Sequence, residues 1–249
     1  MDVKEFFGKY AEEYAKSDSH AKGSDLELLI SLLNVNASLN ALDLATGTGF
    51  TAVALAKKVK HVAALDKTSE MLLQARKLAE SENTANIEFV VGDVEKLPYS
   101  DGEFDIVTSR RAPHHFSDKP AFLAEAFRVL KPGGTLGISD MVSPEGDVER
   151  RYDKFEAIRD PSHAGAETLT SWKRLLKTAG FQIREAIGYE DRIRFEKWLH
   201  PVPMESEEGK ECLEFLTYAT PEFKKLIGFM EDDTSFIKKR AVIVAGKPA

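Results

Sequence analysis

Cysteine, long apolar runs and excess positive charge are all scarce in this 249-residue chain. Its single cysteine, Cys212, excludes an intrachain disulfide. No stretch approaches the roughly 20 apolar residues of a membrane-spanning helix, and the charged start MDVKEFFGKYAEEYAKS has no apolar signal-peptide core. We therefore expect a soluble, cytoplasmic protein without a membrane span.

The formal net charge of -7 argues against a nonspecific nucleic-acid binder, because such proteins present a basic surface. Basic pairs do occur locally, at Arg110–Arg111 and Arg150–Arg151. Hydrophobic residues make up 43% of the chain. This composition can supply the core of one large domain, alone or with an added lobe.

Short apolar runs that favour strands alternate with longer patterns that favour helices. The predicted strands are 40–45, 61–66, 87–93, 104–110, 135–142, about 181–186 and a final strand from residue 235. Helices are predicted between them, and a charged helical pair within 196–233. This order predicts an α/β fold, a doubly wound, mostly parallel, seven-stranded Rossmann-like sheet with helices on both faces.

The stretch ALDLATGTGFTAVALA, residues 41–56, has two glycines, Gly47 and Gly49, where the first strand gives way to a helix. Glycines let a ligand approach the main chain, and the helix N-terminus adds partial positive charge. Read as G-x-G-x-x-A, the turn also fits a dinucleotide fingerprint. The turn therefore indicates a ligand site without specifying the ligand.

Three acids, Asp43, Asp66 and Asp93, lie in or at the end of the first three strands. Ligands of such sheets bind beyond the carboxyl ends of the strands. A carboxylate at the position of Asp66 can accept hydrogen bonds from the ribose of NAD or of another adenosine cofactor. The alternative for each acid is a role as a helix cap or turn former.

Four stretches resemble, in order and spacing, the class I S-adenosylmethionine-dependent methyltransferases: LDLATGTG, ALD, VVGDVEKLPYSDGEFDIV and RVLKPGGTL. The resemblance spans about residues 39–142, and the stretch APHHFSDKPAFLAEAFRVLKPGG is typical of the small-molecule group that includes ubiquinone/menaquinone-biosynthesis methyltransferases. One departure is Ala45, which replaces the first glycine of the usual turn and is tolerated there if its φ stays negative.

The resemblance implies roles for individual residues. Asp66 would hold the ribose hydroxyls, Asp93 would accept from the adenine amino group, and Arg110 would lie near the methionyl portion or the substrate. A Y-x-x-S-x-x-H-x-x-G pattern adds three residues near the cofactor or substrate. The complete predicted cofactor-binding set is Tyr14, His20, Gly23, Asp43, Ala45, Thr46, Gly47, Gly49, Asp66, Lys67, Met71, Asp93, Val94 and Arg110.

NAD is the less favoured cofactor. An acid shortly before the glycine turn suits an ammonium group and is a poor neighbour for a diphosphate. No metal site is expected, because adjacent His114 and His115 point in different directions and neither a cysteine nor clustered carboxylates complete a site. We therefore expect S-adenosylmethionine as the cofactor, with S-adenosylhomocysteine as the product, and no metal.

We expect a single methyltransferase domain over residues 1–249. Residues 1–36 would form N-terminal lid helices, and residues 37–142 the cofactor-binding core. Two insertions, 144–170 and 196–233, would cover the substrate. The second of these could instead form a dimer contact, so the protein is expected to be a monomer or a homodimer.

The expected reaction is methyl transfer to an O-, C- or N-nucleophile of a small molecule, for example a phenol or quinol. Such an acceptor can need a base, and His115 or His163 could supply it, although each could instead pack or cap a turn. Arg110, Arg111 and Arg159 indicate an anionic partner, with Arg110 facing the site and Arg111 pointing away. The alternatives are a non-catalytic S-adenosylmethionine-binding module and a methyltransferase acting on a macromolecule.

Overall fold

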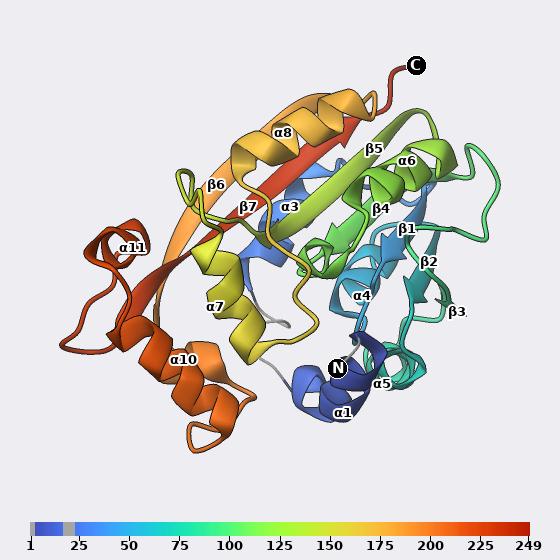
Figure 1. Cartoon of the computed structure of the whole chain (residues 1–249). Coiled ribbons are helices and arrows are strands. Elements are labelled where there is room, and N and C mark those ends of the chain that lie inside the picture. The colour runs from blue at the N-terminus through green and yellow to red at the C-terminus, as the bar shows by residue number, and fades with distance from the viewer. Residues whose placement is uncertain (1–2, 17–22) are drawn as a thin grey trace.

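The computed structural model describes residues 3–16 and 23–249, and these contain a seven-stranded sheet of order β3-β2-β1-β4-β5-β7-β6 (Figure 1). β1 to β5 run parallel, and β7 runs antiparallel to both β5 and β6. The strands are β1 Asn40–Leu44, β2 His61–Asp66, β3 Ile87–Val91, β4 Phe104–Arg110, β5 Leu130–Met141, β6 Gln182–Arg194 and β7 Ser235–Gly246. The predicted α/β, mostly parallel sheet is confirmed.

The helices connect these strands or precede them. They are α1 Val3–Ala15, α3 Ser24–Leu32, α4 Phe50–Ala56, α5 Ser69–Ser81, η1 Pro113–His115, α6 Lys119–Val129, α7 Arg151–Arg159, α8 Leu169–Thr178, α9 Phe195–Leu199, α10 Glu207–Thr217 and α11 Pro221–Leu226. None of the helices in the described ranges is long and apolar enough to cross a bilayer.

Helices cover both faces of the sheet because successive strand residues point to opposite faces. Leu42 and Leu44 of β1 belong to the buried cluster that contains the apolar sides of α6 and α8. Ala41, between the strand start and Leu42, belongs to a second cluster with α3 and α4. Apolar side chains on both faces explain why the central strands read as nearly continuous hydrophobic runs.

The order of the strands places a crevice above the middle of the sheet. β1 is followed along the chain by β2 on one side, whereas β4 lies on its other side. Loops leaving β1 and β4 therefore diverge, and a space opens at their carboxyl ends. This is the edge at which the sequence places the glycine turn and the acids.

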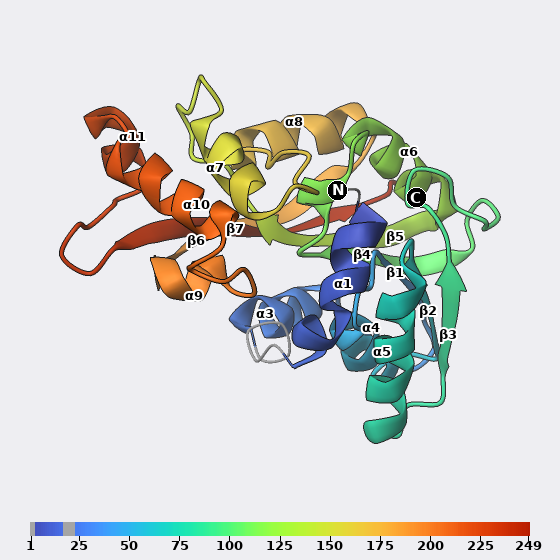
Figure 2. The same ribbon diagram turned by 60° about the horizontal axis from the view of Figure 1, so that its bottom comes forward.

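β6 and β7 extend past the other strands and support a third buried cluster. β6 pairs with β7 from Gln182 opposite Gly246 to Arg194 opposite Ser235, so it is much longer than the predicted 181–186. Figure 2 shows α9, α10 and α11 around the far ends of these two strands. Residues 196–233 contain the predicted helical pair, α10 and α11, and also most of a third helix, α9, which begins at Phe195.

Candidate functional site

A cavity of about 560 Å³ lies at the carboxyl ends of the parallel strands, and residues of α1, of the segment after α7 and of α9 also line it. Many of the predicted site residues line it: Tyr14, Ala45, Thr46, Gly47, Asp66, Lys67, Met71, Asp93, Val94, Arg110, His115 and His163. Gly23, Asp43 and Gly49 do not line it, and His20 lies outside the described residues.

We name two parts of this cavity by their residues. The glycine-turn end is lined by Ala45–Gly47, Asp66 and Asp93, and the basic end by Arg159, Lys197, Lys238 and Arg240. β2 lies on one side of β4 and β7 on the other, so the cavity runs across the sheet edge from one end to the other. His114 and His115 follow β4, between the two ends.

In the turn after β1, the main chain at Gly47 adjoins open space. Gly47 has a φ of +56°. A Cβ added to Gly47 would meet no atom within 4 Å, so open space adjoins this turn. Ala45 has a φ of +51°, and the expectation of a negative φ is therefore wrong. A non-glycine residue in this region costs about 1–2 kcal/mol.

Asp43 stabilises the turn from beneath instead of facing the cavity. Its Oδ2 accepts a hydrogen bond from Thr46 Oγ1 (2.6 Å), and its Oδ1 accepts one from Thr108 Oγ1 (2.7 Å). Its carboxylate is almost completely buried, and this burial raises the pKa of Asp43 to about 6. The sequence analysis predicted that Asp43 contacts the cofactor, but in the structure Asp43 does not line the cavity and instead stabilises the turn that does.

Two of the predicted glycines have packing or capping positions. Gly49 has a φ of +87° and precedes α4, where a Cβ would lie 2.8 Å from the Cβ of Ala75. It therefore lets α4 approach α5. Gly23 is the N-cap of α3 with a φ of -64°, a value open to any residue. The structure does not bring either glycine to the cavity.

Asp66 ends β2 and joins two parts of the glycine-turn end. Its Oδ2 accepts a hydrogen bond from Gly47 N (2.8 Å), and its Oδ1 accepts one from Thr68 N (2.8 Å). Burial raises the pKa of Asp66. Each oxygen keeps a second lone pair, so the carboxylate can still accept hydrogen bonds from a ligand.

Asp93 and Lys67 form an ion pair on the rim of the same end. Lys67 Nζ lies 3.0 Å from Asp93 Oδ2, and both side chains are about half-exposed. The other oxygen of Asp93 accepts from Glu95 N (3.0 Å). Burial works against ionisation of Asp93, but these partners outweigh it and hold its pKa below the usual value. The rim therefore offers a charged acceptor beside the buried Asp66.

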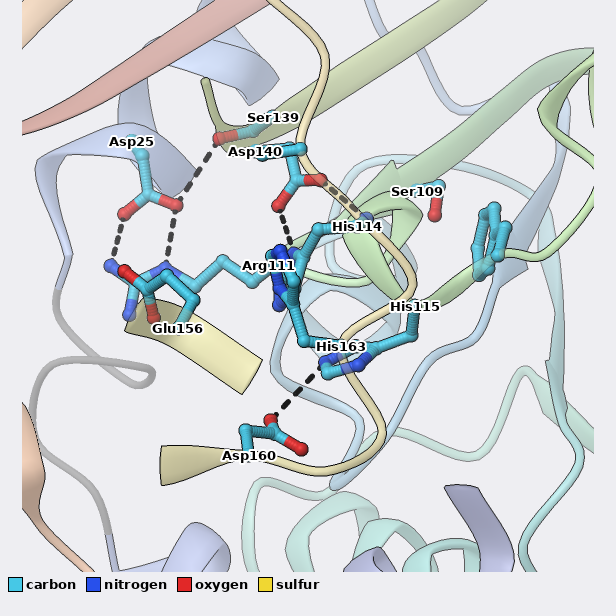
Figure 3. Close-up of polar contacts among 12 residues, drawn as sticks. Asp25, Ser109, Arg111, His114, His115, Ser139, Asp140, Glu156, Asp160 and His163 are labelled. Carbon is cyan, nitrogen blue, oxygen red and sulfur yellow. Dashed lines mark hydrogen bonds and ion pairs between the residues drawn. The ribbon is translucent and has the colours of Figure 1, made fainter. Parts of the chain in front are cut away.

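Arg110 and Arg111 share one buried carboxylate. Arg110 Nε and Nη2 donate to the two oxygens of Asp25 on α3 (2.6 and 3.0 Å), and Arg111 does so at 3.1 and 2.7 Å. Burial raises the pKa of Asp25, but the two guanidiniums outweigh it and hold that pKa well below its usual range. Figure 3 shows Asp25 directed at Arg111.

This arrangement corrects the prediction for the arginine pair. Arg110 was expected to face the site and Arg111 to point away from it, because residues leaving a strand alternate sides. Arg111 has a φ of +53°, which breaks the alternation and turns its side chain to the same carboxylate. Both arginines line the cavity.

Three histidines gather where the two ends of the cavity meet, each held by a different partner (Figure 3). His114 Nδ1 lies 2.7 Å from Asp140 Oδ1, and the main-chain nitrogen of His114 donates to the other oxygen of Asp140 (2.8 Å). Since a carboxylate only accepts, Nδ1 carries the proton and Nε2 keeps its lone pair. This geometry can orient a neutral imidazole as a proton acceptor.

Burial controls the charges of this pair. It lowers the pKa of His114 well below the ordinary value and raises the pKa of Asp140 to about 6. At neutral pH the imidazole is therefore uncharged and the carboxylate is ionised. The other two histidines differ in their partners: His115 Nδ1 lies 3.1 Å from Ser162 O, and His163 Nε2 lies 2.8 Å from Asp153 Oδ1.

The basic end contains a second buried carboxylate shared by two cations. Glu156 is fully buried, with Lys238 Nζ 3.3 Å from its Oε1 and Arg159 Nη2 3.2 Å from its Oε2. The indole of Trp198 donates to Oε1 (3.2 Å), and the Arg159 guanidinium lies 5.1 Å from the Trp198 ring centroid. This cluster holds two cations at the cavity with one buried anion.

The sequence analysis missed several of these residues. His114 was noted only as part of a histidine pair. Asp140 is the next-to-last residue of β5, and an acid so close to the carboxyl end of a strand is a signal that could have been used. Asp25, Glu156 and Lys238 carry no local signal, because their partners lie far away in the chain.

Within the described ranges, no group of three or more histidine, cysteine, aspartate or glutamate side chains is arranged to hold a metal ion.

Comparison with known proteins identifies the class. A family model described as a methyltransferase domain matches residues 36–193. This match spans more than half of the chain, so the chain belongs to this methyltransferase family. The seven-stranded fold and the cavity beyond the β1 turn agree with a class I S-adenosylmethionine-dependent methyltransferase, and S-adenosylmethionine is its cofactor.

Individual relatives are similar over most of the chain. The uncharacterised methyltransferase YcgJ of Bacillus subtilis is 31% identical over 217 residues, which cover 87% of this chain and 86% of that protein. A crystal structure from Bacillus halodurans C-125 has a TM-score of 0.86 at 35% identity, covering 91% of this chain and 100% of the other. The ubiquinone/menaquinone biosynthesis C-methyltransferase of Dinoroseobacter shibae is 34% identical over 133 residues, covering 52% of this chain and 53% of that protein.

Proposed function

We propose that this methyltransferase transfers the methyl group of S-adenosylmethionine to an O-, C- or N-nucleophile of a small molecule, such as a phenol or quinol. The observation that carries the proposal is the continuity of one cavity of about 560 Å³. It joins the glycine turn and Asp66 at one end to histidines and basic residues at the other. Such a cavity can hold a cofactor and a small acceptor side by side.

The glycine-turn end fits the cofactor. Gly47 has open space beside it, which favours close approach of a ligand to the main chain. Asp66 would accept from the ribose hydroxyls, and Asp93 with Val94 would hold the adenine. S-adenosylmethionine supplies a methyl group already activated by its sulfonium, so the protein must align the acceptor and exclude water. Phe7 and Tyr14 of α1 line the cavity and would serve as part of the lid.

A histidine would remove the acceptor's proton. His115 and His163 remain candidates from the sequence, and His114 joins them as the best oriented, because Asp140 fixes its protonated nitrogen. Its unprotonated Nε2 can accept a proton from a hydroxyl or an amine, and the resulting imidazolium would be stabilised by the ionised Asp140. A general base of this kind is typically worth about 10²–10⁴-fold in rate.

The acceptor is proposed to be anionic, since basic side chains from several elements line the cavity. A cytoplasmic location and a monomeric or dimeric state stay predictions of the sequence. The ubiquinone/menaquinone enzymes share only about half of the chain, so a quinol acceptor rests on that partial similarity.

The function is tested by methyl transfer from S-adenosylmethionine with a radiolabelled methyl group to a panel of phenols, quinols, amines and acids. We expect label in one small-molecule class and production of S-adenosylhomocysteine that depends on the acceptor. S-adenosylhomocysteine should also raise the melting temperature. At a hundredfold excess over its dissociation constant, its binding should add about 2.7 kcal/mol to the free energy of unfolding.

Each alternative predicts a different outcome. A non-catalytic module would bind S-adenosylhomocysteine but label no compound, and a macromolecular methyltransferase would label only protein or nucleic acid. Stabilisation by NADH with none by S-adenosylhomocysteine would contradict the proposal. His114→Gln should lower turnover at least a hundredfold, whereas His61→Gln, on the distant start of β2, should leave it unchanged.

A further inference from the structure

Buried cations gather at and beside the basic end of the cavity. Arg159 and Lys238 both pair with Glu156, which is fully buried, and the charge of a second buried acid, Asp160, also acts on Arg159. Arg110 and Arg111 both pair with Asp25. The chain as a whole has a net charge of -7, so this gathering of cations is not a reflection of its composition.

Arg240 lies close enough to influence a cation in each cluster. Burial, together with the nearby charges of Arg159 and Arg240, outweighs the opposing effect of Glu156 and lowers the pKa of Lys238 to about 7. Burial also lowers the pKa of Arg111, and Arg240 again adds to this effect. Arg240 has an acid partner of its own, Asp191, but at 3.6 Å and with more than half of the Asp191 side chain exposed.

One of these guanidiniums has a buried donor that the protein does not use. Arg159 Nε is shielded from solvent and has no hydrogen-bond partner among the described residues. An unpaired donor of this kind costs about 1–3 kcal/mol unless a ligand satisfies it. Arg159, Lys238 and Arg240 come from α7 and β7, and all three line the cavity.

Apolar side chains lie beside these cations. Met141 at the end of β5, Ile193 at the end of β6 and Trp198 on α9 line the same part of the cavity. A charged oxyacid group could therefore be bound at the basic end while an apolar body lies against these three side chains. The reacting atom would then face the histidines between the two ends.

We propose that Arg159, Lys238 and Arg240 of the basic end form a recognition site for an acid group, a carboxylate or a phosphate, on the methyl acceptor. This inference rests on the proposed function, because it specifies the substrate class of the same cavity. Of the three arginines named from the sequence, the proposal keeps Arg159, to which the unmatched donor belongs, and sets aside Arg110 and Arg111, whose charge is balanced in part by Asp25.

The site is tested by calorimetric titration of the full-length protein saturated with S-adenosylhomocysteine. The probes are benzoate and phenyl phosphate, each an anion, and benzamide as the neutral counterpart. We expect at least one anion to bind at least tenfold more tightly than benzamide. Comparison of the two anions distinguishes a carboxylate site from a phosphate site.

Neighbouring lysines of β7 supply a matched pair of variants. Lys238→Met should weaken anion binding at least tenfold, and Lys238→Arg should restore most of it. Lys239→Met should have no effect, because Lys239 pairs with Glu190 and does not line the cavity. Thermal melts identify any variant that fails to fold, in which case Arg240→Met against Lys239→Met gives the same comparison.

Three outcomes would overturn the inference: equal binding of benzamide and the anions, no binding of either anion at millimolar concentration, or equal losses in Lys238→Met and Lys239→Met. The titration with S-adenosylhomocysteine that precedes these measurements reports separately on the proposed function. Cofactor binding without anion binding would remove the acid-group site and leave the methyltransferase proposal intact.

Discussion

The glycine-turn end and the basic end of the cavity are assembled from the chain in different ways. The glycine-turn end comes from the loops after β1, β2 and β3, which are neighbours in both sequence and sheet. The basic end joins α7, α9 and β7, and Glu156 of α7 pairs there with Lys238 of β7, which lies far away in the sequence. Local sequence patterns specify the first end, whereas long-range ion pairs specify the second.

Because of this difference, mutations at the two ends should have different effects. At the glycine-turn end, main-chain groups and a few strand-end acids face the ligand, so a change there should act mainly on cofactor binding. At and beside the basic end, buried cations pair with the buried carboxylates of Glu156 and Asp25, and removal of one carboxylate leaves buried positive charge without that partner. Changes to these carboxylates should therefore act first on folding.

Asp25→Ala should produce the largest effect, because two buried guanidiniums would lose their shared partner. We expect the free energy of unfolding, measured by urea denaturation, to fall by about 3–5 kcal/mol. The control is Asp101→Ala, since the side chain of Asp101 is 82% exposed and pairs with Arg128. This substitution should lower the free energy of unfolding by at most about 1 kcal/mol. Similar losses in the two variants would contradict the account.

The same carboxylate gives a pH dependence with a defined sign. The pKa of Asp25 is lower in the folded protein than in the unfolded chain, so its contribution is present above the unfolded value of about 3.9. It is lost as the pH falls below that value toward the folded pKa. The stability difference between wild type and Asp25→Ala should therefore shrink in acid.

Asp66→Ala should weaken binding of S-adenosylhomocysteine by roughly 10- to 100-fold, since hydrogen bonds to a charged acceptor are worth about 1.5–3 kcal/mol each. Calorimetry on folded protein measures this loss. Asp105→Ala is the control, because Asp105 pairs with Lys131 away from the cavity and should leave the affinity unchanged. An unchanged affinity in Asp66→Ala would remove this residue from the cofactor site.

Arg110→Ala and Arg111→Ala should lower stability by similar amounts, about 1–3 kcal/mol each, because both bind the two oxygens of Asp25. Their effects should not add, since the residues share one partner. A double-mutant cycle followed by urea denaturation measures the coupling. Additive losses in the double variant, or a loss of stability in only one of the single variants, would contradict this shared pairing.

Ala45→Gly should have the smallest effect and the opposite sign. Glycine relieves the left-handed conformation of residue 45, worth about 1–2 kcal/mol, and loses about 0.4–1 kcal/mol through the entropy of the unfolded chain. The expected net gain is roughly 0.5–1 kcal/mol in thermal or urea unfolding. A loss of stability would show that the alanine methyl group makes a compensating contact.

The elements that the sequence predicted well are those whose boundaries have a local cause. β2 and β4 were predicted at their observed limits: β2 is an apolar run closed by Asp66, and β4 combines apolar and β-branched residues before Arg110. β6 was predicted at half its length, because its outer part, GYEDRIR, is rich in charged residues that do not favour a strand. Pairing with β7, not propensity, extends it.

The candidate site divides in the same way. Asp66 and Asp93 could be identified because their positions follow from strand ends, and both line the cavity. The φ of Ala45 and the turn of Arg111 toward Asp25 could not be predicted, because each depends on backbone conformations that no residue type dictates. The partnership of Glu156 with Lys238 arises only when α7 packs against β7.

The central claim is that the cofactor occupies the glycine-turn end and leaves the basic end to the acceptor. A crystal structure of the protein with S-adenosylhomocysteine tests it most directly. The account predicts the ribose at Asp66, the adenine beside Asp93 and Val94, and the sulfur facing the histidines, with the space at Arg159 and Lys238 not taken by the cofactor. Density for the cofactor at Arg159 and Lys238, with Asp66 left without a ligand contact, would contradict it.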